Sequence, residues 1–164
     1  SLAGVVGVIC GLLTVLPVWA EESSIDADGL WVNRNGWIIE ASSCDDGVCG
    51  TVVGMRAGAN PSQRLDIHNP DENLRQREIC GIMIFGGFEP NGAAGEWDNG
   101  WIYNPQDGKT YSSTMKRGAG DTLEVRGFVL TPMFGRTIVL TGALEPAQRC
   151  STLESSVPHD AGGQ

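Results

Sequence analysis

Eight short apolar segments, separated by clusters of Gly, Asn, Asp and Pro, limit what this chain can fold into more than any other feature. They cover residues 29–33, 36–42, 48–55, 79–88, 97–103, 109–116, 121–130 and 136–144. Segment 121–130 alternates between an apolar face, with Leu123 and Val125, and a polar face, with Glu124 and Arg126. Short loops favour antiparallel neighbours, and eight strands are enough to close a small barrel. We therefore expect an all-β fold, an eight-stranded antiparallel barrel over residues 29–144.

The connection between the third and fourth strands is dense in charge, in the stretch "DIHNPDENLRQREICG" at residues 66–81. Asn69 is a favourable N-cap, and Pro70 suits the first position of a helix. Acidic residues stand early in this stretch and basic ones late: Asp71, Glu72, Arg75 and Arg77. This order complements the helix dipole, so the sequence predicts one short helix between strands 3 and 4.

Two functional alternatives remain open for the same stretch. It can be a lid at a barrel mouth, where Arg75 or Arg77 binds an anionic group of a ligand through its planar guanidinium. It can also supply acid–base chemistry through Asp66 or Asp71, although the sequence shows no environment that would separate the pKa values of two carboxyl groups. If the barrel has a polar ligand contact, we expect it here.

Aromatic residues are concentrated on the predicted strands: Trp31, Trp37, Trp97, Trp101, Tyr103 and Tyr111. Two-residue spacing predicts that Trp97, Trp101 and Tyr103 share one face of a strand. Such side chains can fill an eight-stranded barrel completely. Alternatively, together with Tyr111 they line a cavity for a small, largely apolar or amphipathic ligand, which their polar groups would orient.

The hairpin "SCDDGVCG" at residues 43–50 carries the first of two expected disulfides. Asp46 and Gly47 form a favourable two-residue turn. With these residues at its centre, Cys44 faces Cys49 at a distance that suits a disulfide. We therefore predict a bridge between Cys44 and Cys49.

Two further cysteines, Cys80 and Cys150, can form a second bridge that pins the C-terminal segment to a strand, although sequence alone does not fix this pairing. The two histidines, His68 and His159, stand apart from each other and from any cysteine pair. Because metal sites need more ligands at recognisable spacing, we expect neither a metal nor a cofactor. The chain also lacks the sequence motifs of hydrolases, metalloproteases and phosphate-binding loops.

The two ends of the chain look different from its middle. Residues 1–20 contain no charge and end on Val18-Trp19-Ala20, with small residues in the positions that a signal peptidase requires. This predicts a cleaved signal peptide at 1–20, a short lead at 21–28, and a periplasmic or secreted protein; a membrane anchor is the alternative. Residues 145–164 are expected to be largely disordered.

The net charge of −9 restricts the partners of the chain. An acidic protein repels the phosphates of nucleic acids and the surface of anionic lipid bilayers. We therefore expect no nucleic-acid partner and no stable membrane insertion after the signal is cleaved.

Several motifs in a fixed order resemble one known family. "GLW" comes first, followed by "D-x-x-NP-x-x-x-LR-x-R" from Asp66, "IYNPQDGKTY" from Ile102 and "LEVRGFV" from Leu123. This order resembles the secreted bacterial family called domain of unknown function 2147. The resemblance implies a lipocalin-like barrel, with Gly29 and Trp31 similar to the lipocalin entry motif, and it implies no enzymatic activity.

The chain departs from that family in its last strand. Family members often end this strand with an aromatic residue and an arginine, whereas this chain has "IVLTGAL" at residues 138–144. If that arginine caps the base of the barrel near the tryptophan of the first strand, the base must be closed differently here.

These observations predict a periplasmic or secreted barrel that binds a small, largely apolar molecule without covalent chemistry. A second hypothesis is an interaction module of the cell envelope, which a solid core and an exposed apolar patch would favour. A third is an enzyme of unknown reaction, which carboxyl groups with strongly raised pKa values in a cleft would favour.

Overall fold

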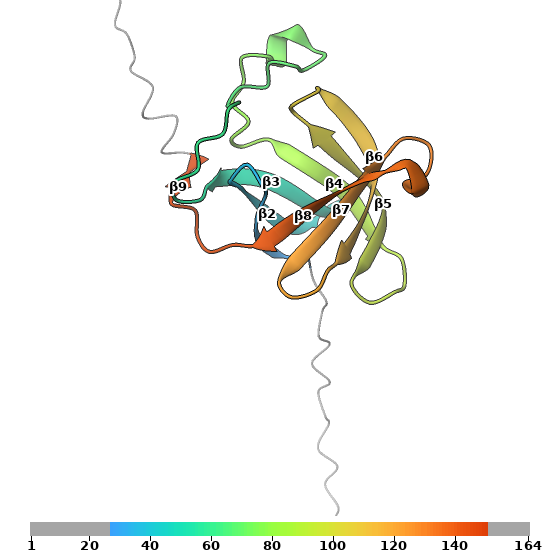
Figure 1. Cartoon of the computed structure of the whole chain (residues 1–164). Helices are drawn as coiled ribbons and strands as arrows, with labels where there is room; N and C mark the ends of the chain where they lie inside the picture. The colour runs from blue at the N-terminus through green and yellow to red at the C-terminus, as the bar shows by residue number, and fades with distance from the viewer. Residues whose placement is uncertain (1–26, 151–164) are drawn as a thin grey trace, which may run out of the picture.

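The computed structural model describes residues 27–150, and these form an antiparallel β-barrel (Figure 1). Its strands are β1 (Gly29–Val32), β2 (Trp37–Cys44), β3 (Gly47–Met55), β4 (Met83–Pro90), β5 (Glu96–Asn104), β6 (Lys109–Arg117), β7 (Thr122–Phe128), β8 (Arg136–Gly142) and the short β9 (Gln148–Arg149). The strand order is β2-β1-β8-β7-β6-β5-β4-β3, and pairing between β2 and β3 closes the ring. The predicted eight-stranded antiparallel barrel is confirmed. The predicted signal peptide and residues 151–164 of the predicted tail lie outside the described residues.

The connections of the barrel alternate between its two ends, as an antiparallel meander requires. We call the end that carries the β1–β2, β3–β4, β5–β6 and β7–β8 connections the rim, and the opposite end the base. The longest connection at the rim, residues 56–82, joins β3 to β4 and rises above the strands in Figure 1. Gln63 ties it to the β5–β6 turn, because its side-chain amide donates a 2.8 Å hydrogen bond to the carbonyl oxygen of Pro105.

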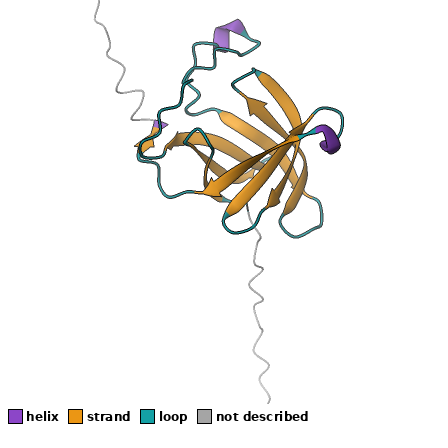
Figure 2. Ribbon diagram, in the orientation of Figure 1, coloured by secondary structure: helices purple, strands orange, loops and turns teal. Residues whose placement is uncertain are grey.

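The prediction of a short helix between strands 3 and 4 is wrong, because this segment contains a single 3-10 turn, Glu72–Leu74. Helical ribbon in Figure 2 is confined to single turns. The cap is Asp71, whose carboxylate accepts a 3.0 Å hydrogen bond from the Asn73 amide. Asn69 lies two residues before this cap, and its Oδ1 accepts a 2.9 Å hydrogen bond from the backbone N–H of Asp71. Its side-chain NH2 donates into a buried network with Asp66 and Tyr103. Asn69 therefore makes a local turn contact and a tertiary contact at once.

The inside of the barrel is filled by its own side chains. The rings of Phe85 and Phe88 meet edge to face, with their centroids 5.8 Å apart. Each ring lies over a glycine: a Cβ on Gly50 would stand 2.2 Å from the Phe85 ring, and one on Gly100 would stand 2.3 Å from the Phe88 ring. Other large buried side chains complete the interior: Trp31, Trp37, Ile39, Val52, Met55, Trp97, Met115, Leu123, Val125 and Leu140. The interior around these rings is a packed core.

The predicted Cys44–Cys49 disulfide is present, with the Cα atoms 5.9 Å apart, but the predicted turn is displaced. Cys44 pairs with Gly47, and Cys49 pairs with Ser42, so Asp45 and Asp46 form the turn. The two cysteines are therefore diagonal neighbours on the ladder. Gly47 is required in the strand, because a Cβ there would stand 2.2 Å from the carbonyl oxygen of Phe88.

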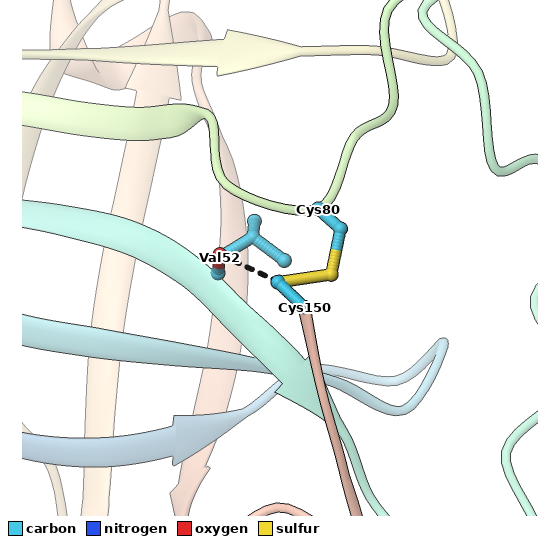
Figure 3. Close-up of a disulfide and its surroundings, with 3 residues drawn as sticks. All are labelled: Val52, Cys80 and Cys150. Carbon is cyan, nitrogen blue, oxygen red and sulfur yellow. Dashed lines mark hydrogen bonds between the residues drawn. A yellow bond between two sulfur atoms is a disulfide. The ribbon is translucent and has the colours of Figure 1, made fainter. Parts of the chain in front are cut away.

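The second predicted pairing, Cys80–Cys150, is also present, with the Cα atoms 5.3 Å apart. It joins the rim connection to the residue that follows β9, as Figure 3 shows. Sγ of Cys150 lies 3.2 Å from the carbonyl oxygen of Val52, a close contact without a shared proton because a disulfide sulfur carries no hydrogen. β9 itself pairs with the end of β3 at Gly54 and Met55. Residues 145–150 are thus held against the barrel.

An arginine does lie on the first-strand tryptophan, but it comes from β6 rather than from the last strand. The guanidinium of Arg117 stands 4.8 Å from the centre of the Trp31 ring, within the range of a cation–π contact. The indole nitrogen of Trp31 donates a 2.8 Å hydrogen bond to the carbonyl oxygen of Ala27. Arg117 therefore lies at the base of the barrel, where the C-terminal part of β8, residues 138–142, has no arginine.

Candidate functional site

Three of the predicted site residues meet under the rim connection. Asp66 comes from residues 56–82, Arg77 follows the 3-10 turn, and Tyr103 lies near the end of β5. The hydroxyl of Tyr103 donates a 2.5 Å hydrogen bond to Oδ1 of Asp66. Nε and Nη2 of Arg77 reach Oδ2 of the same carboxylate at 3.1 and 2.9 Å. The sequence placed Asp66 and Arg77 in one candidate group, and the structure adds Asn69 as a donor to Oδ2 at 2.7 Å.

Electrostatics make this cluster an anchor rather than an acid catalyst. Burial alone would raise the pKa of Asp66, but hydrogen bonds from Tyr103, Asn69 and Arg77 outweigh burial and lower this pKa below its ordinary value. Burial and the hydrogen bond to Asp66 raise the pKa of Tyr103 to about 12. The carboxylate is thus ionised and its acceptor atoms are occupied by protein donors. The cluster holds residues 56–82 on β5.

Arg75 does not join that cluster. Its Nε donates a 2.9 Å hydrogen bond to the carbonyl oxygen of Asn69, and its Nη1 pairs with Glu72 at 3.2 Å. The structure therefore separates the two arginines of the predicted site. Arg77 turns toward the buried carboxylate, whereas Arg75 braces the exposed 3-10 turn.

The prediction that Trp97, Trp101 and Tyr103 share one face is wrong. Trp97 pairs with Met115 and Ile102 pairs with Tyr111, but the register shifts between Trp97 and Gly100. This β-bulge changes the alternation, so Trp97 faces the core while Trp101 and Tyr103 lie on the outer face of β5. Tyr103 is nevertheless buried, because residues 56–82 fold over it.

Tyr111 lies at the rim, on β6. Its hydroxyl donates a 2.7 Å hydrogen bond to Asp107 in the β5–β6 turn, and this bond, with burial, raises the pKa of Tyr111 above its ordinary value. A hollow of about 380 Å³ opens beside it. The hollow is lined by residues of β6, the end of β7 and the following loop: Lys109, Thr110, Tyr111, Ser112, Phe128, Val129 and Leu130.

Four apolar side chains next to this hollow project into solvent from the β7–β8 loop. Val129, Leu130, Met133 and Phe134 are 60%, 92%, 81% and 77% exposed. We call these four residues the apolar tip. The sequence analysis missed them, because it assigned Val129 and Leu130 to a strand and gave no role to "TPMFG". The signal that could have found them is the concentration of large apolar residues around a proline and a glycine, where a turn is expected.

The loop that carries the apolar tip is held in one conformation. The guanidinium of Arg126 on β7 donates to the carbonyl oxygens of Pro132 at 2.6 Å and Met133 at 3.4 Å. Its Nη1 also donates to the hydroxyl of Thr137 at 2.9 Å. Pro132–Phe134 forms a 3-10 turn, and Leu130 has a left-handed backbone with φ of 70°. Four exposed apolar side chains on an ordered, strained loop are typical of a recognition surface.

A second hollow, of about 290 Å³, crosses the outer face of β5 to β8 and is lined mainly by polar and charged side chains, among them Glu96, Asp98, Glu124 and Arg126. Lys116 and Glu124 form an ion pair of 3.3 Å there. Within residues 27–150, no group of three or more His, Cys, Asp and Glu side chains could hold a metal ion. Among the same residues, no helix has the length and apolar character needed to cross a membrane.

Comparisons with known proteins agree with this architecture. The model of a family described as "Uncharacterized protein conserved in bacteria (DUF2147)" matches residues 29–141. Among solved structures, protein HP1028 from Helicobacter pylori, described as belonging to the lipocalin family, matches with a TM-score of 0.62 and 18% sequence identity. That match covers 73% of this chain and 84% of HP1028, and at this identity it shows a shared fold. No curated protein matches the chain.

Proposed function

Since the chain belongs to the DUF2147 family of uncharacterised bacterial proteins and has a lipocalin-like barrel, we propose that it is an exported, non-catalytic binding protein. Its ligand is a small, largely apolar or amphipathic molecule. The binding surface is the apolar tip together with the hollow beside Tyr111. The observation that carries this proposal is the exposure of four large apolar side chains on a loop that Arg126 holds in place.

The filled core explains why the ligand is placed outside the barrel. Phe85 and Phe88 occupy the interior next to Gly50 and Gly100, and neither surface hollow is lined by these rings. A hollow of about 380 Å³ is within the size range of small-molecule sites, about 300–1,000 Å³. The rim therefore offers a hollow of this size outside the packed core.

The chemistry of the rim favours an amphipathic molecule. Phe128, Val129 and Leu130 supply apolar contacts along one side of the hollow, and Lys109 supplies a cation at its edge. An acyl chain or aromatic ring with one anionic group would satisfy both. Among the predicted ligand residues, Tyr111 lines this hollow, whereas Asp66 and Arg77 are engaged with each other.

Export is part of the proposal and rests on two supports. Residues 1–20 have the composition of a signal peptide. Two disulfides, Cys44–Cys49 and Cys80–Cys150, are typical of proteins in an oxidising compartment such as the periplasm. We propose a periplasmic or secreted location on these grounds.

Fluorescence titration with two naphthalene probes tests the binding site. N-phenyl-1-naphthylamine is neutral, whereas 1-anilinonaphthalene-8-sulfonate carries an anionic group that Lys109 can attract. We expect saturable binding of both probes, with the anionic probe binding more tightly. The double substitution Leu130→Ser and Phe134→Ser should abolish this binding, and Lys109→Gln should weaken only the anionic probe.

Ile67→Ser is the matched control, because Ile67 is also an exposed apolar residue but lies on the rim connection. It should leave the binding of both probes unchanged. The proposal is overturned if neither probe binds saturably with a Kd below about 1 mM. Equal losses in Ile67→Ser and in the tip variant would also overturn it, because binding would then not depend on the tip.

A second candidate function is the cell-envelope interaction module. The packed core and the four exposed side chains of the apolar tip favour it. The open edge of β8 favours it as well, because an unpaired strand edge recruits another strand.

A further inference from the structure

We propose that the free edge of β8 pairs with β8 of a second copy of this chain, so that the protein forms a two-fold symmetric dimer. This goes beyond the binding of a small molecule at the apolar tip. It starts from the pairing between β1 and β8, which closes the ring through a short ladder. β1 pairs with β8 only through Trp31 with Gly142 and Val32 with Thr141.

The upper part of β8 has one neighbour where a barrel strand normally has two. Its ladder with β7 runs from Arg136 to Thr141, whereas β1 ends at Val32 and the chain turns away into β2. Among the described residues, no backbone hydrogen bond outside the β7 ladder reaches residues 136–140. Such an edge carries unpaired N–H and C=O groups that only another extended strand satisfies along its whole length.

The side chains of this edge are apolar and exposed. Ile138 is 40% exposed and Val139 is 51% exposed. Natural edge strands are usually protected by lysines, prolines, bulges or a covering segment. Among residues 136–140, "RTIVL", the sole charge is Arg136 at the start of the strand. An unprotected apolar edge favours a permanent partner over exposure to water.

Symmetry points to a second copy as that partner. An antiparallel pair about Ile138 places Arg136 of one copy opposite Leu140 of the other, because the chain positions are mirrored around residue 138. The pair uses residues 136–140, since β1 occupies the same edge from Thr141 onward. The exposed side chains of Ile138 and Val139 from both copies then meet at the two-fold axis as a self-complementary surface.

The charge distribution supports the same occupant. The chain has 20 acidic residues and a net charge of −9, so two copies repel each other over most of their surfaces. From Val125 to Leu144, however, the sequence contains no Asp or Glu and only two basic residues, Arg126 and Arg136. The β8 edge lies in the middle of this stretch. Because β8 has no carboxylate, two copies can approach at this edge without repulsion between acidic side chains of the two strands.

Native mass spectrometry and light scattering of the purified full chain measure the oligomeric state directly. We expect a concentration-dependent dimer. Val139→Lys should weaken dimerisation by about tenfold or more, because it places two lysines at the paired edges. Ile67→Lys introduces the same charge on the rim connection and should leave the dimer unchanged.

Cross-linking tests the register. An antiparallel pair about Ile138 places the two Ile138 Cα atoms about 4.5–5.5 Å apart, a distance at which cysteines form a disulfide. We expect Ile138→Cys to give a covalent dimer on a non-reducing gel, and Ile67→Cys to remain a monomer under the same conditions.

A wild-type chain that is monomeric at all concentrations overturns the proposal. A dimer that survives Val139→Lys and does not cross-link through Ile138→Cys also overturns it, because another surface then forms the contact. If the chain is a monomer and an added extended apolar peptide slows hydrogen exchange of the β8 amides, the edge binds a different protein and the proposal is overturned. These measurements do not use the fluorescent probes. They therefore test the dimer whether or not the apolar tip binds a small molecule.

Discussion

Tyr103 on β5 donates a 2.5 Å hydrogen bond to Asp66 in the rim connection, and both side chains are buried. The bond joins residues 37 positions apart in the chain. It fixes residues 56–82 on the outer face of the β5–β6 hairpin, where the backbone of His68 packs directly against Gly108. One buried carboxylate therefore holds the longest connection of the rim in place.

This pair predicts how stability depends on pH. The folded-state pKa of Asp66 is lowered, so its contribution is present above the unfolded pKa of about 4 and is lost as the pH falls below that value. The pKa of Tyr103 is raised to about 12, so its contribution is present below about pH 10 and is lost as the pH rises from about 10 to 12. Urea unfolding across the pH range should show both losses.

Tyr103→Phe separates the pair from other titrating groups. It removes one donor from a buried carboxylate, and we expect a loss of about 1–3 kcal/mol at neutral pH. The variant should lack the part of the alkaline loss that belongs to Tyr103. Its acid loss should be smaller, because removal of this donor brings the folded-state pKa of Asp66 closer to the unfolded value. A variant whose pH profile is parallel to that of the wild type would contradict the assignment.

The two disulfides should differ in their contributions to stability. Cys80–Cys150 closes a loop with a sequence separation of 70, whereas Cys44–Cys49 closes one with a separation of 5. Chain entropy then gives about 4 kcal/mol for the first bridge and about 2 kcal/mol for the second. Thermal unfolding of the two double Cys→Ser variants measures the difference. Equal losses, or a larger loss at the hairpin, would contradict this account.

Sequence patterns were sufficient for the strands of the barrel, since turn residues and apolar segments marked them along the chain. They failed where a tertiary contact replaced a local preference. Asn69 looks like an N-cap, but the 3-10 turn is capped by Asp71, and the side-chain NH2 of Asn69 donates to Asp66. Gly47 looks like a turn residue, but the backbone of Phe88 lies too close for any side chain there. Neither contact can be derived from neighbouring residues.

The interior predicts a steric coupling between Gly50 and Phe85. A Cβ at Gly50 would stand 2.2 Å from the Phe85 ring, so Gly50→Ala should lower the free energy of unfolding by about 1–3 kcal/mol through overpacking. Phe85→Leu removes the obstructing ring, and the double variant should therefore be more stable than the sum of the two single losses implies. Strict additivity in urea unfolding would show that the ring and the glycine are not in contact.

The base of the barrel predicts a role for Arg117. Its guanidinium lies over the Trp31 ring at 4.8 Å, and its Nη1 is buried without a hydrogen-bond partner among the described residues. Arg117→Gln should lower stability by about 1–2 kcal/mol and change the fluorescence of Trp31, because a cation–π contact is lost. Arg117→Lys should retain part of both. Lys116→Gln, at the adjacent outward-facing position, is the control. It should leave the fluorescence unchanged and lower stability by less than about 1 kcal/mol, through loss of the exposed ion pair with Glu124.

The apolar tip shows a different limit of sequence reasoning. Apolar residues in a segment predict burial, and nothing in "VLTPMFG" distinguishes a buried strand end from an exposed loop. Exposure depends on where the clamp from Arg126 holds the loop, and that clamp joins a strand residue to the carbonyl oxygens of residues 132 and 133. The candidate surface thus follows from tertiary geometry.

Leu130 connects the stability of the loop to its proposed role. A leucine with φ of 70° occupies a left-handed conformation that costs roughly 1–2 kcal/mol relative to glycine. The side chain is 92% exposed and makes little contact that would offset this cost. Leu130→Gly should therefore raise the free energy of unfolding by about 0.5–1 kcal/mol, while it weakens probe binding at the tip. The comparison variant Leu130→Asn tolerates the same backbone and should behave alike in both assays. If Leu130→Gly instead destabilised the protein, Leu130 would be a packing residue. Its conformation would then no longer support a binding role for the apolar tip.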